Sequence, residues 1–410
     1  MSLASVPVCD TPLDDSVVHL DSNFEYRSSI PCRICANTAV PFDVVDLAKH
    51  CSQDEPYPDG FSGVSVAYHR CRICGAIFSP SFDGESQAKL PTSISDTRHR
   101  AIASDHETGV LGTAARHMLA MRRRYRNARV LAYGVGAYAL ADRLCQGGYR
   151  RVEAFDISSR AEKPVGTFDI VLAVDCIEHT LKPVEAVRDM CRYLEHDGCI
   201  VVEQELQPDD IHEVRGNWWY IAPRAGHVCM YSAPAVASLA QVCGLTFHEG
   251  ETVHGFSRQA MSPLSRHVLS VIGKPSYFVP LLAPAVEALP STFDWRCWSQ
   301  GEVAGAGGFR WSHSGRLTWP LPEFHHLPAT LRLMMPFCDR ITPELLQGVH
   351  LYQGWLKTDF RLVGSNLVAD IQVTKPMSHV YVDTPKPMTP RSVRGDPDDR
   401  SLGIAVLCRR

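Results

Sequence analysis

The chain has 410 residues, of which 45% are hydrophobic and 21% are charged. This balance excludes a wholly disordered protein, and the length exceeds what one hydrophobic core usually organises, so we expect two or three domains. The 41 Lys and Arg residues and 45 Asp and Glu residues give a formal net charge of −4. Such a charge provides no general attraction for nucleic acid or for an anionic membrane surface, and we expect neither as a partner.

The 15 cysteines are an odd number, and no basic segment followed by an apolar run opens the chain. No run in the sequence predicts a transmembrane helix. We therefore expect a cytoplasmic protein with reduced thiols rather than a disulfide framework. The spacing of four of the cysteines predicts another role for them.

Two short segments, Cys32-Arg-Ile-Cys35 and Cys71-Arg-Ile-Cys74, predict a metal site. Each can direct two thiolates at one point, and together they complete a tetrahedral shell that suits Zn²⁺ at about 2.3 Å per bond. Four protein ligands leave no open position, so we expect a structural zinc ion in a knuckle region over 28–100. Redox dithiols or packed cysteines are the alternatives, and His50 and Cys51 are lower-ranked ligands.

From residue 128 onward, short apolar strands alternate with helices. The run 128–133 has strand character and leads into Gly134 and Gly136, after which 140–145 is predicted as a helix. Glycines in this context let the backbone approach a ligand at the helix N-terminus. The next strand, 151–155, ends in Asp156, whose carboxylate can accept hydrogen bonds from ribose hydroxyls. We favour that role over an exposed turn residue.

A third strand, 168–174, ends at Asp175, which is followed by Glu178 and His179. A helix is predicted from Pro183, and 199–202 is the next strand. Such βα units imply a Rossmann-like α/β fold with an open, mostly parallel sheet that binds ligands at the carboxyl ends of its strands. We therefore expect Asp175 to contact cofactor or substrate, whereas Glu178 suits either that role or the first turn of the next helix.

The stretch 128–255 resembles a class I S-adenosylmethionine-dependent methyltransferase domain in its glycine loop, spaced aspartate and Asp-x-x-Glu-His motif. The block from Gly216 to His227, with its Trp-Trp-Tyr-Ile-Ala-Pro-Arg-Ala-Gly-His sequence, resembles a bacterial subgroup of that family that also carries N-terminal cysteine pairs. The resemblance covers about 28–258. It implies S-adenosylmethionine as the cofactor of a domain over 101–258, bound by the two glycines and the two aspartates named above.

Two positions depart from the family's pattern. Ala132 stands where the first strand of the family carries an acidic residue, and Tyr138 stands where the loop carries a third glycine. The missing carboxylate removes a usual contact to the cofactor's amino group, and a tyrosine can crowd the methionine moiety. A methyltransferase-like protein that binds a partner without catalysis is therefore an alternative.

Candidate residues for acting on the acceptor follow the strands 168–174 and 199–202. His179 and His227 are the candidate general bases, because histidine titrates nearest neutral pH, although a structural hydrogen bond is an alternative role for His179. Arg224 can hold a carboxylate or phosphate of the acceptor through two hydrogen bonds. Tyr220 and the two preceding tryptophans either line the acceptor pocket or fill the core.

Prolines recur through 259–290, and we interpret this segment as a connector. After 291 short β-like runs alternate with turns, at 348–352, 367–373, 379–382 and 402–407, which predicts a β-sandwich-like domain over 291–410. The closing stretch 396–406 faintly resembles the end of β-sandwich modules attached to bacterial polysaccharide-modifying enzymes. Tryptophans such as Trp319 fit sugar stacking, but buried tryptophans are commoner in such domains.

These observations predict an enzyme that transfers a methyl group to oxygen, nitrogen or carbon of a small-molecule or saccharide-type acceptor. A nicotinamide-dependent oxidoreductase is the second enzyme class, because the glycine loop and Asp156 also fit a dinucleotide fingerprint. The sequence specifies neither the acceptor nor the oligomeric state. We expect loss of zinc to loosen the N-terminal region and to leave cofactor binding mostly intact, because the cysteines lie outside the nucleotide-binding strands.

Overall fold

A computed structural model describes residues 29–84, 111–121, 123–134, 136–156, 163–282, 302–304, 307–312, 315–336, 349–353, 356–363, 366–384 and 405–407. No helix within these ranges is both long and apolar enough to cross a lipid bilayer.

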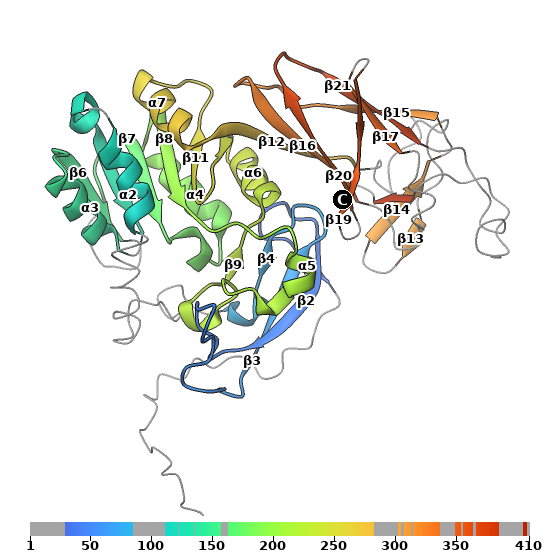
Figure 1. The fold of residues 1–410 in the computed structure, drawn as a ribbon, viewed down its shortest axis with the longest axis horizontal. Helices are drawn as coiled ribbons and strands as arrows, with labels where there is room; N and C mark the ends of the chain where they lie inside the picture. Colours follow the sequence, from blue (N-terminus) through green and yellow to red (C-terminus); the bar gives the residue numbers. More distant parts are fainter. Residues whose placement is uncertain are drawn as a thin grey trace, which may run out of the picture.

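A sheet of ten strands forms the centre of the molecule (Figure 1). From one edge to the other its strands are β19 (Arg361–Val363), β20 (Asn366–Val373), β16 (Ala329–Pro336), β12 (Lys274–Pro280), β10 (Thr246–Glu249), β11 (Val253–Ser257), β8 (Leu194–Glu203), β7 (Phe168–Val174), β5 (Arg129–Tyr133) and β6 (Arg151–Phe155). The strands from β6 to β8 pair in parallel. β5, β6 and β7 agree with the predicted runs within one residue, whereas β8 begins at Leu194, five residues before the predicted strand 199–202.

The sheet as a whole is mixed rather than mostly parallel, which corrects the prediction. β11 runs antiparallel to β8, and β10 runs antiparallel to both β11 and β12. A parallel crossover needs a dozen residues or more, and the short turn at 250–252 between β10 and β11 leaves no room for one. Parallel pairing returns between β12 and β16.

Helices cover both faces of the parallel strands. One face carries α2 (Leu111–Ala120), α3 (Ala137–Gln146) and α7 (Pro263–Ile272), and the other carries α4 (Pro183–Arg192) and α6 (Ala233–Val242). On the first face Leu140 and Leu269 share a core with Leu172. On the second face Val187 and Leu239 belong to the core that contains Val171. The three layers bury both sides of the strands, as their continuous apolar runs require.

The N-terminal region forms four strands of a second sheet, and the fifth strand comes from the central region. The strands are β1 (Ile30–Pro31), β2 (Thr38–Asp46), β3 (Ser65–Cys71), β4 (Ile77–Phe78) and β9 (Cys229–Met230), in that order. β9 follows the segment 216–227, the aromatic block of the central region, and pairs with β4 through Ile77 and Met230. Both side chains are buried in one core with Tyr68. The N-terminal region is therefore joined to the central one by a shared sheet.

The segment 259–282 is not a connector, which corrects the prediction. It contains α7 and β12, and β12 lies between β10 and β16 in the central sheet. Pro263 occupies the first turn of α7, and the preceding Ser262 accepts a hydrogen bond from the backbone N–H of Ser265. Proline is well suited to that position because its missing N–H would have no helical partner.

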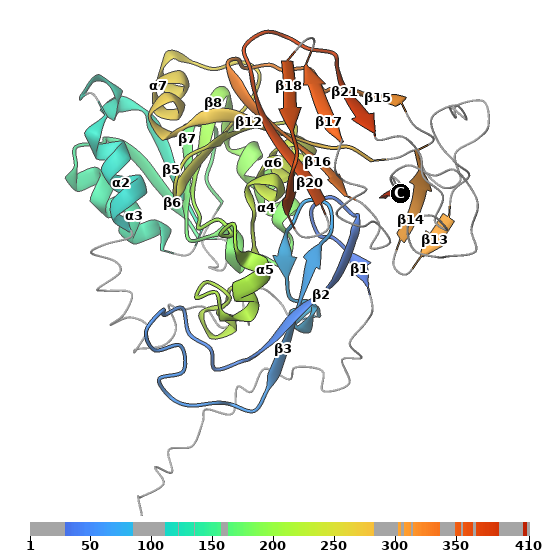
Figure 2. The ribbon, with the colours of Figure 1, turned by 45° about the vertical axis from the view of Figure 1, so that its right-hand side comes forward.

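The C-terminal strands continue the central sheet through β12 and β16 (Figure 2). Two further sheets are formed by β15 (Gly315–Pro320), β21 (His379–Thr384), β17 (His350–Gln353) and β18 (Leu356–Asp359), and by β13 (Glu302–Ala304), β14 (Gly307–Trp311) and β22 (Ala405–Leu407). Leu317 and Val382 share a core with Leu331 and Val373 of the central sheet. Trp319 is buried there and donates a hydrogen bond to the Leu282 carbonyl at 3.1 Å, so it is a packing residue.

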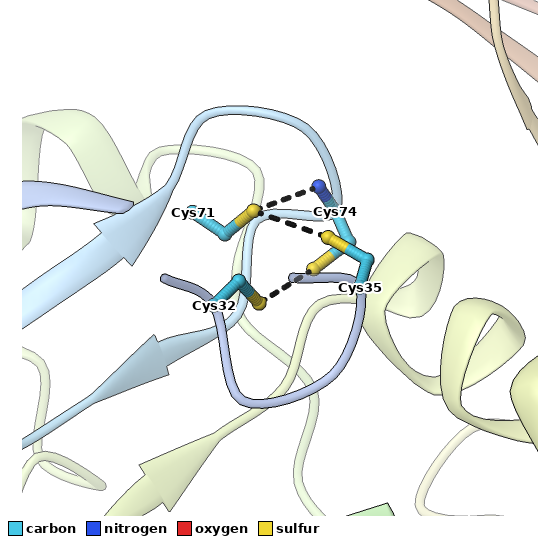
Figure 3. Close-up of side chains that lie close together, drawn as sticks. All are labelled: Cys32, Cys35, Cys71 and Cys74. Carbon is cyan, nitrogen blue, oxygen red and sulfur yellow. Dashed lines mark hydrogen bonds between the residues drawn. The ribbon is translucent and has the colours of Figure 1, made fainter. Parts of the chain in front are cut away.

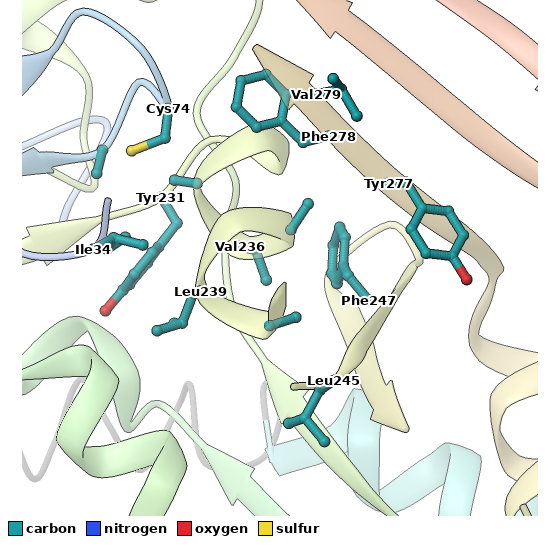
Figure 4. Close-up of a cluster of buried hydrophobic side chains, with 14 of the residues drawn as sticks. Ile34, Cys74, Tyr231, Val236, Leu239, Leu245, Phe247, Tyr277, Phe278 and Val279 are labelled. Carbon is teal, nitrogen blue, oxygen red and sulfur yellow. The ribbon is translucent and has the colours of Figure 1, made fainter. Parts of the chain in front are cut away.

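Helix α6 lies between the three parts of the molecule (Figure 4). Ile34 and Cys74 of the N-terminal region and Tyr277 and Phe278 of β12 belong with Val236 of α6 to one buried cluster. A helix that contacts apolar residues all round is stabilised by burial rather than by its own propensity. One buried cluster therefore includes residues of all three parts of the molecule, beside the separate cores of the α2–α3–α7 face and of the N-terminal sheet.

Candidate functional site

Four cysteines gather where the two Cys-Arg-Ile-Cys turns face each other (Figure 3). The sulfur atoms of Cys32, Cys35, Cys71 and Cys74 all lie within 4.8 Å of one another. The Cys32–Cys74 and Cys35–Cys71 sulfur pairs are separated by 3.6 and 3.5 Å, and all four residues are free thiols. Zinc–sulfur bonds of about 2.3 Å in a tetrahedron place sulfurs about 3.8 Å apart. The cluster thus has the size of a tetrahedral thiolate shell.

The two turns have the same backbone geometry. In each, the first cysteine accepts a hydrogen bond from the residue four positions on, and its N–H donates to the residue five positions on. Ala36 and Gly75, which follow the two pairs, both have positive φ, at 57° and 77°. The N–H groups of Ile34 and Ile73 point at the sulfurs of Cys32 and Cys71 at 3.4 Å. These N–H···S contacts stabilise thiolates.

The glycine loop lies between β5 and α3, at the carboxyl edge of the parallel strands. Gly134 and Gly136 have φ values of 103° and 85°, a backbone region in which side chains are strained. A Cβ atom on Gly134 would lie 2.7 Å from the sulfur of Cys176, whereas one on Gly136 would meet no atom within 4 Å. The N-terminus of α3 therefore faces open space beside the loop, as ligand binding at that point requires.

Two predicted acidic residues lie at the ends of neighbouring strands. Asp156 directly follows β6 and is half-buried, and Asp175 directly follows β7 and is exposed. Asp175 has a positive φ of 44°, which is unusual for a residue with a side chain and recurs at functional sites. Because β5 lies between β6 and β7, both aspartates flank the glycine loop at the point where the strand order reverses.

The two departures from the family's pattern have different structural consequences. Ala132 is fully buried in the middle of β5, between Ala154 of β6 and Leu172 of β7. Tyr138 lies on α3 and is 52% exposed, so its side chain does not fill the buried interior.

Glu178, His179 and His227 form a second cluster. One ligand atom from each lies within 4.8 Å of those of the other two, and all three residues are buried. Glu178 and His179 belong to the turn η4 (Ile177–His179), which follows the end of β7. His227 follows the turn η6 (Pro223–Ala225), which is near in space because the N–H of Val228 donates to the Glu178 carbonyl. The structure thus brings together the two predicted bases and the glutamate beside them.

Backbone carbonyls hold both imidazole rings. Nδ1 of His179 donates to the Gly226 carbonyl at 3.0 Å, and Nδ1 of His227 donates to the Tyr220 carbonyl at 2.8 Å. A carbonyl oxygen can only accept, so the lone pair of each neutral ring lies on Nε2. Tyr220 donates its hydroxyl to Oε1 of Glu178 at 2.7 Å. Tyr220, predicted to bind substrate, therefore contacts the cluster itself.

Burial sets the charge states of this cluster. Desolvation raises the pKa of Glu178 to about 7 and lowers the pKa of His179. Oε2 of Glu178 is buried and has no hydrogen-bond partner among the described residues. Near neutral pH the site therefore contains a neutral His179 beside a carboxyl group that titrates within the physiological range.

The N-terminal region contributes residues to this site that sequence reasoning did not assign to it; Cys51, a lower-ranked candidate for the cysteine cluster, lies here instead. Tyr68 donates its hydroxyl to the His227 carbonyl at 2.9 Å, and the Cys51 sulfur lies 3.9 Å from Nδ1 of His227. Lys49 is buried and donates to the carbonyls of Gly216 and Trp218, the latter at 2.8 Å. The two residues of each such contact lie more than 150 positions apart, so no local sequence pattern predicts these contacts.

Glu203 is a further acidic residue that the sequence did not single out. It ends β8, next to the end of β7, and burial raises its pKa to about 7. Its Oε2 accepts a hydrogen bond from the N–H of Ala114 in the first turn of α2 at 3.0 Å. Its position at a strand end is the signal that could have identified it, as for Asp175.

The aromatic residues of the block pack in or against the core, whereas its arginine is exposed. Trp218 and Tyr220 are buried in the core of the N-terminal sheet, and Trp219 packs against that core. Arg224 is exposed, and its N–H donates to the Lys49 carbonyl at 3.1 Å. Its side chain is therefore at the surface rather than within the buried cluster.

Residues 88–249 match a family model described as "Methyltransferase domain". No curated protein sequence matches the chain significantly. A solved O-methyltransferase family protein from Burkholderia thailandensis is 15% identical, with a TM-score of 0.32, over 42% of this chain and 62% of that chain. An O-methyltransferase from neocarzinostatin biosynthesis, solved with S-adenosyl-L-homocysteine and 1,4-dihydroxy-2-naphthoic acid, is 13% identical, with a TM-score of 0.29, over 38% of this chain and 56% of that chain.

The matches to these two structures span less than two thirds of their length. The matched family segment, 88–249, includes the glycine loop, both aspartates and the Glu178–His179–His227 cluster. It ends before α7 and leaves out the four cysteines and the C-terminal strands. The central part of this chain, 88–249, is thus similar in sequence to a methyltransferase domain.

Proposed function

We propose that this protein transfers a methyl group from S-adenosylmethionine to a small-molecule or saccharide-type acceptor. The observation that carries the proposal is the crevice at the ends of β5, β6 and β7. There the two glycines of positive φ open the N-terminus of α3 between Asp156 and Asp175, within a segment that matches a methyltransferase domain. Strand order reverses at this point, which is where sheets of this kind bind nucleotides.

The residues of the crevice have separate proposed roles. Gly134 and Gly136 let the cofactor approach the backbone at the start of α3, and Asp156 accepts hydrogen bonds from its ribose hydroxyls. Asp175 lies between this loop and the buried cluster and contacts cofactor or substrate. The cofactor, when bound, supplies an electrophilic methyl group on a sulfonium sulfur.

His179 and His227 are proposed to act on the acceptor. The acceptor atom bonds to the methyl carbon while the methyl–sulfur bond breaks, and the acceptor's proton passes to Nε2 of one of these rings. Carbonyls orient both rings through Nδ1, so Nε2 of the neutral ring can accept a proton without rearrangement. Much of the acceleration comes from holding the two reacting atoms in line. Arg224, exposed on η6, is proposed to hold an anionic group of the acceptor.

Cys32, Cys35, Cys71 and Cys74 are proposed to bind one structural Zn²⁺. The support is their mutual distances, the matching turns and the N–H···S contacts. A closed four-thiolate shell has no position for substrate, so the metal stabilises the N-terminal sheet and takes no part in the reaction.

Calorimetric titration with S-adenosylhomocysteine tests the cofactor proposal. We expect wild-type protein to bind, and we expect Asp156→Ala to weaken binding about 10- to 100-fold, because a carboxylate hydrogen bond contributes about 1.5–3 kcal/mol. Asp142→Ala, on the exposed side of α3, is the matched control and should bind as wild type. Tight binding of NADH in its place would favour an oxidoreductase, and binding of neither would favour a non-catalytic protein.

A further inference from the structure

The Glu178–His179–His227 cluster brings three side chains that can ligate a metal ion into one buried region. Each ring has given its N–H to a carbonyl, so each presents a lone pair on Nε2. Oε1 of Glu178 already accepts the Tyr220 hydroxyl, while Oε2 is buried and has no partner among the described residues. Burying an unsatisfied carboxylate oxygen costs several kcal/mol unless a cation or a proton compensates.

The surroundings of the cluster also favour a cation. The surroundings add negative charge, because Asp175 and Glu203 end the adjacent strands β7 and β8 and both act electrostatically on this cluster. The ammonium group of Lys49 is bound by two carbonyl oxygens of the aromatic block. A cation at the cluster would compensate the negative charge of the carboxylates Glu178, Asp175 and Glu203.

We propose that Glu178, His179 and His227 bind a divalent transition-metal ion, in a second metal site distinct from the four cysteines. Two imidazole nitrogens and one carboxylate oxygen form the ligand set of catalytic zinc and of non-haem ferrous iron. Three protein ligands leave at least one coordination position for an acceptor oxygen or for water.

The hydrogen bonds to the three ligand side chains are of the kind that orients ligands in metal sites. Histidine ligands commonly donate their second ring N–H to a carbonyl, which fixes the tautomer, and ligating carboxylates are themselves hydrogen-bonded. Gly226 and Tyr220 provide the two carbonyls, and the Tyr220 hydroxyl provides the donor to Glu178. Ligand atoms within 4.8 Å of one another need only small side-chain shifts to reach the roughly 3.4 Å separation of a tetrahedral shell.

The metal's role in catalysis, though not its binding, rests on the methyl-transfer function proposed above. With the ion bound, Nε2 of both rings would be ligands and would no longer take the acceptor's proton. The ion would instead make a coordinated hydroxyl group more acidic, and its proton would leave to solvent or to a carboxylate such as Glu203. The acceptor oxygen would then bond to the methyl carbon while the methyl–sulfur bond breaks. Metal binding can be measured without cofactor or acceptor, so its failure and the failure of the proposed function are distinguishable.

Metal content and cobalt absorption test this site. The full-length protein is loaded with Co²⁺ or Zn²⁺ in modest excess, desalted and analysed for metal per chain. We expect two ions, one with thiolate-to-cobalt charge-transfer bands and one with the weaker bands of nitrogen and oxygen ligands. Glu178→Gln and His227→Gln should each lose one ion and keep the thiolate bands. Tyr220→Phe should weaken the second ion's affinity about tenfold or more.

The matched control is Glu205→Gln, a half-buried carboxylate beyond the end of β8, which should keep both ions. A wild-type spectrum with thiolate bands alone and no second ion at any metal excess would overturn the proposal, and would favour a proton shared within the cluster. Retention of the second ion by folded Glu178→Gln and His227→Gln would also overturn it. If either variant does not fold, the count and spectrum of the wild-type protein still decide.

Discussion

His254 shows how single side chains are fixed in this protein. Its Nδ1 accepts a hydrogen bond from the N–H of Gly250 at 3.2 Å, and its Nε2 donates to the Gln204 carbonyl at 3.0 Å. Both contacts require the neutral ring, because a protonated Nδ1 could not accept. Burial accordingly lowers the pKa of His254 to about 4. The residue is a satisfied packing histidine on β11 rather than a candidate base.

This histidine should make the protein sensitive to acid. Its folded pKa lies below its unfolded value of about 6.5, so its contribution is complete above pH 6.5 and is lost as the pH falls toward 4. The full loss is about 3 kcal/mol of unfolding free energy. Urea unfolding measured between pH 7 and pH 5 should show a smaller pH dependence for His254→Gln than for wild type. An equal dependence in this variant and in the control His196→Gln, an exposed residue, would contradict the assignment.

At the scale of elements, the β2–β3 hairpin links the four cysteines to the buried cluster. Its strands lead into the cysteine turns at one end, and at the other end its loop carries Lys49 and Cys51 to the aromatic block and His227. Tyr68 of β3 bonds the His227 carbonyl directly. The cysteines are therefore separate from the glycine loop, as the sequence predicts, but their hairpin supports the histidine side of the site.

Loss of one cysteine should show whether the metal stabilises the hairpin or also affects cofactor binding. We expect Cys32→Ser to lower the bound zinc and to increase hydrogen exchange in β2, β3 and the segment around His227, because the hairpin loses its fixed end. Affinity for S-adenosylhomocysteine should change by only a few fold, since Gly134 and Asp156 follow β5 and β6 of the central sheet rather than strands of the N-terminal sheet. Cys145→Ser, an exposed cysteine on α3, is the control. Unchanged metal content in Cys32→Ser would contradict the zinc proposal, and loss of cofactor binding with the hairpin still protected would contradict its structural role.

Elements with strong local signals were predictable from the sequence. β5, β6 and β7 are apolar runs that end at glycine or aspartate, and their boundaries in the structure agree closely with those expected. α7 was missed because prolines were interpreted as breaks, although Pro263 lies where proline starts a helix. The β12–β16 and β4–β9 pairings depend on residues far apart in sequence, and hydrophobic patterns do not specify strand partners.

In the candidate site, too, residues with local sequence signals were predictable and residues placed by long-range contacts were not. His179, His227 and the four cysteines were identifiable from residue type and spacing, and the structure brings each set together. Glu178 was ambiguous because a carboxylate after a strand also suits a helix start. Lys49 and Tyr68 were not identifiable, since only the folded chain places them beside the aromatic block and His227.

At the scale of the whole molecule, the three parts share one core. The central sheet runs from the parallel strands through β12 into the C-terminal strands, and the N-terminal sheet ends on β9. Such continuity predicts that truncation at residue 258 would expose the apolar edge formed by β10 and leave Phe247 without its β12 neighbours. The site itself lies at the opposite end of the sheet order, where β5, β6 and β7 meet.

The most direct test of the account is a crystal structure of the protein grown with saturating S-adenosylhomocysteine. We predict ligand density along Gly134 and Gly136 at the N-terminus of α3, with the ribose hydroxyls bound by Asp156 and the sulfur directed toward Asp175 and the Glu178–His179–His227 cluster. A ligand bound elsewhere on the molecule, or an empty crevice at the ends of β5, β6 and β7, would contradict the proposed function.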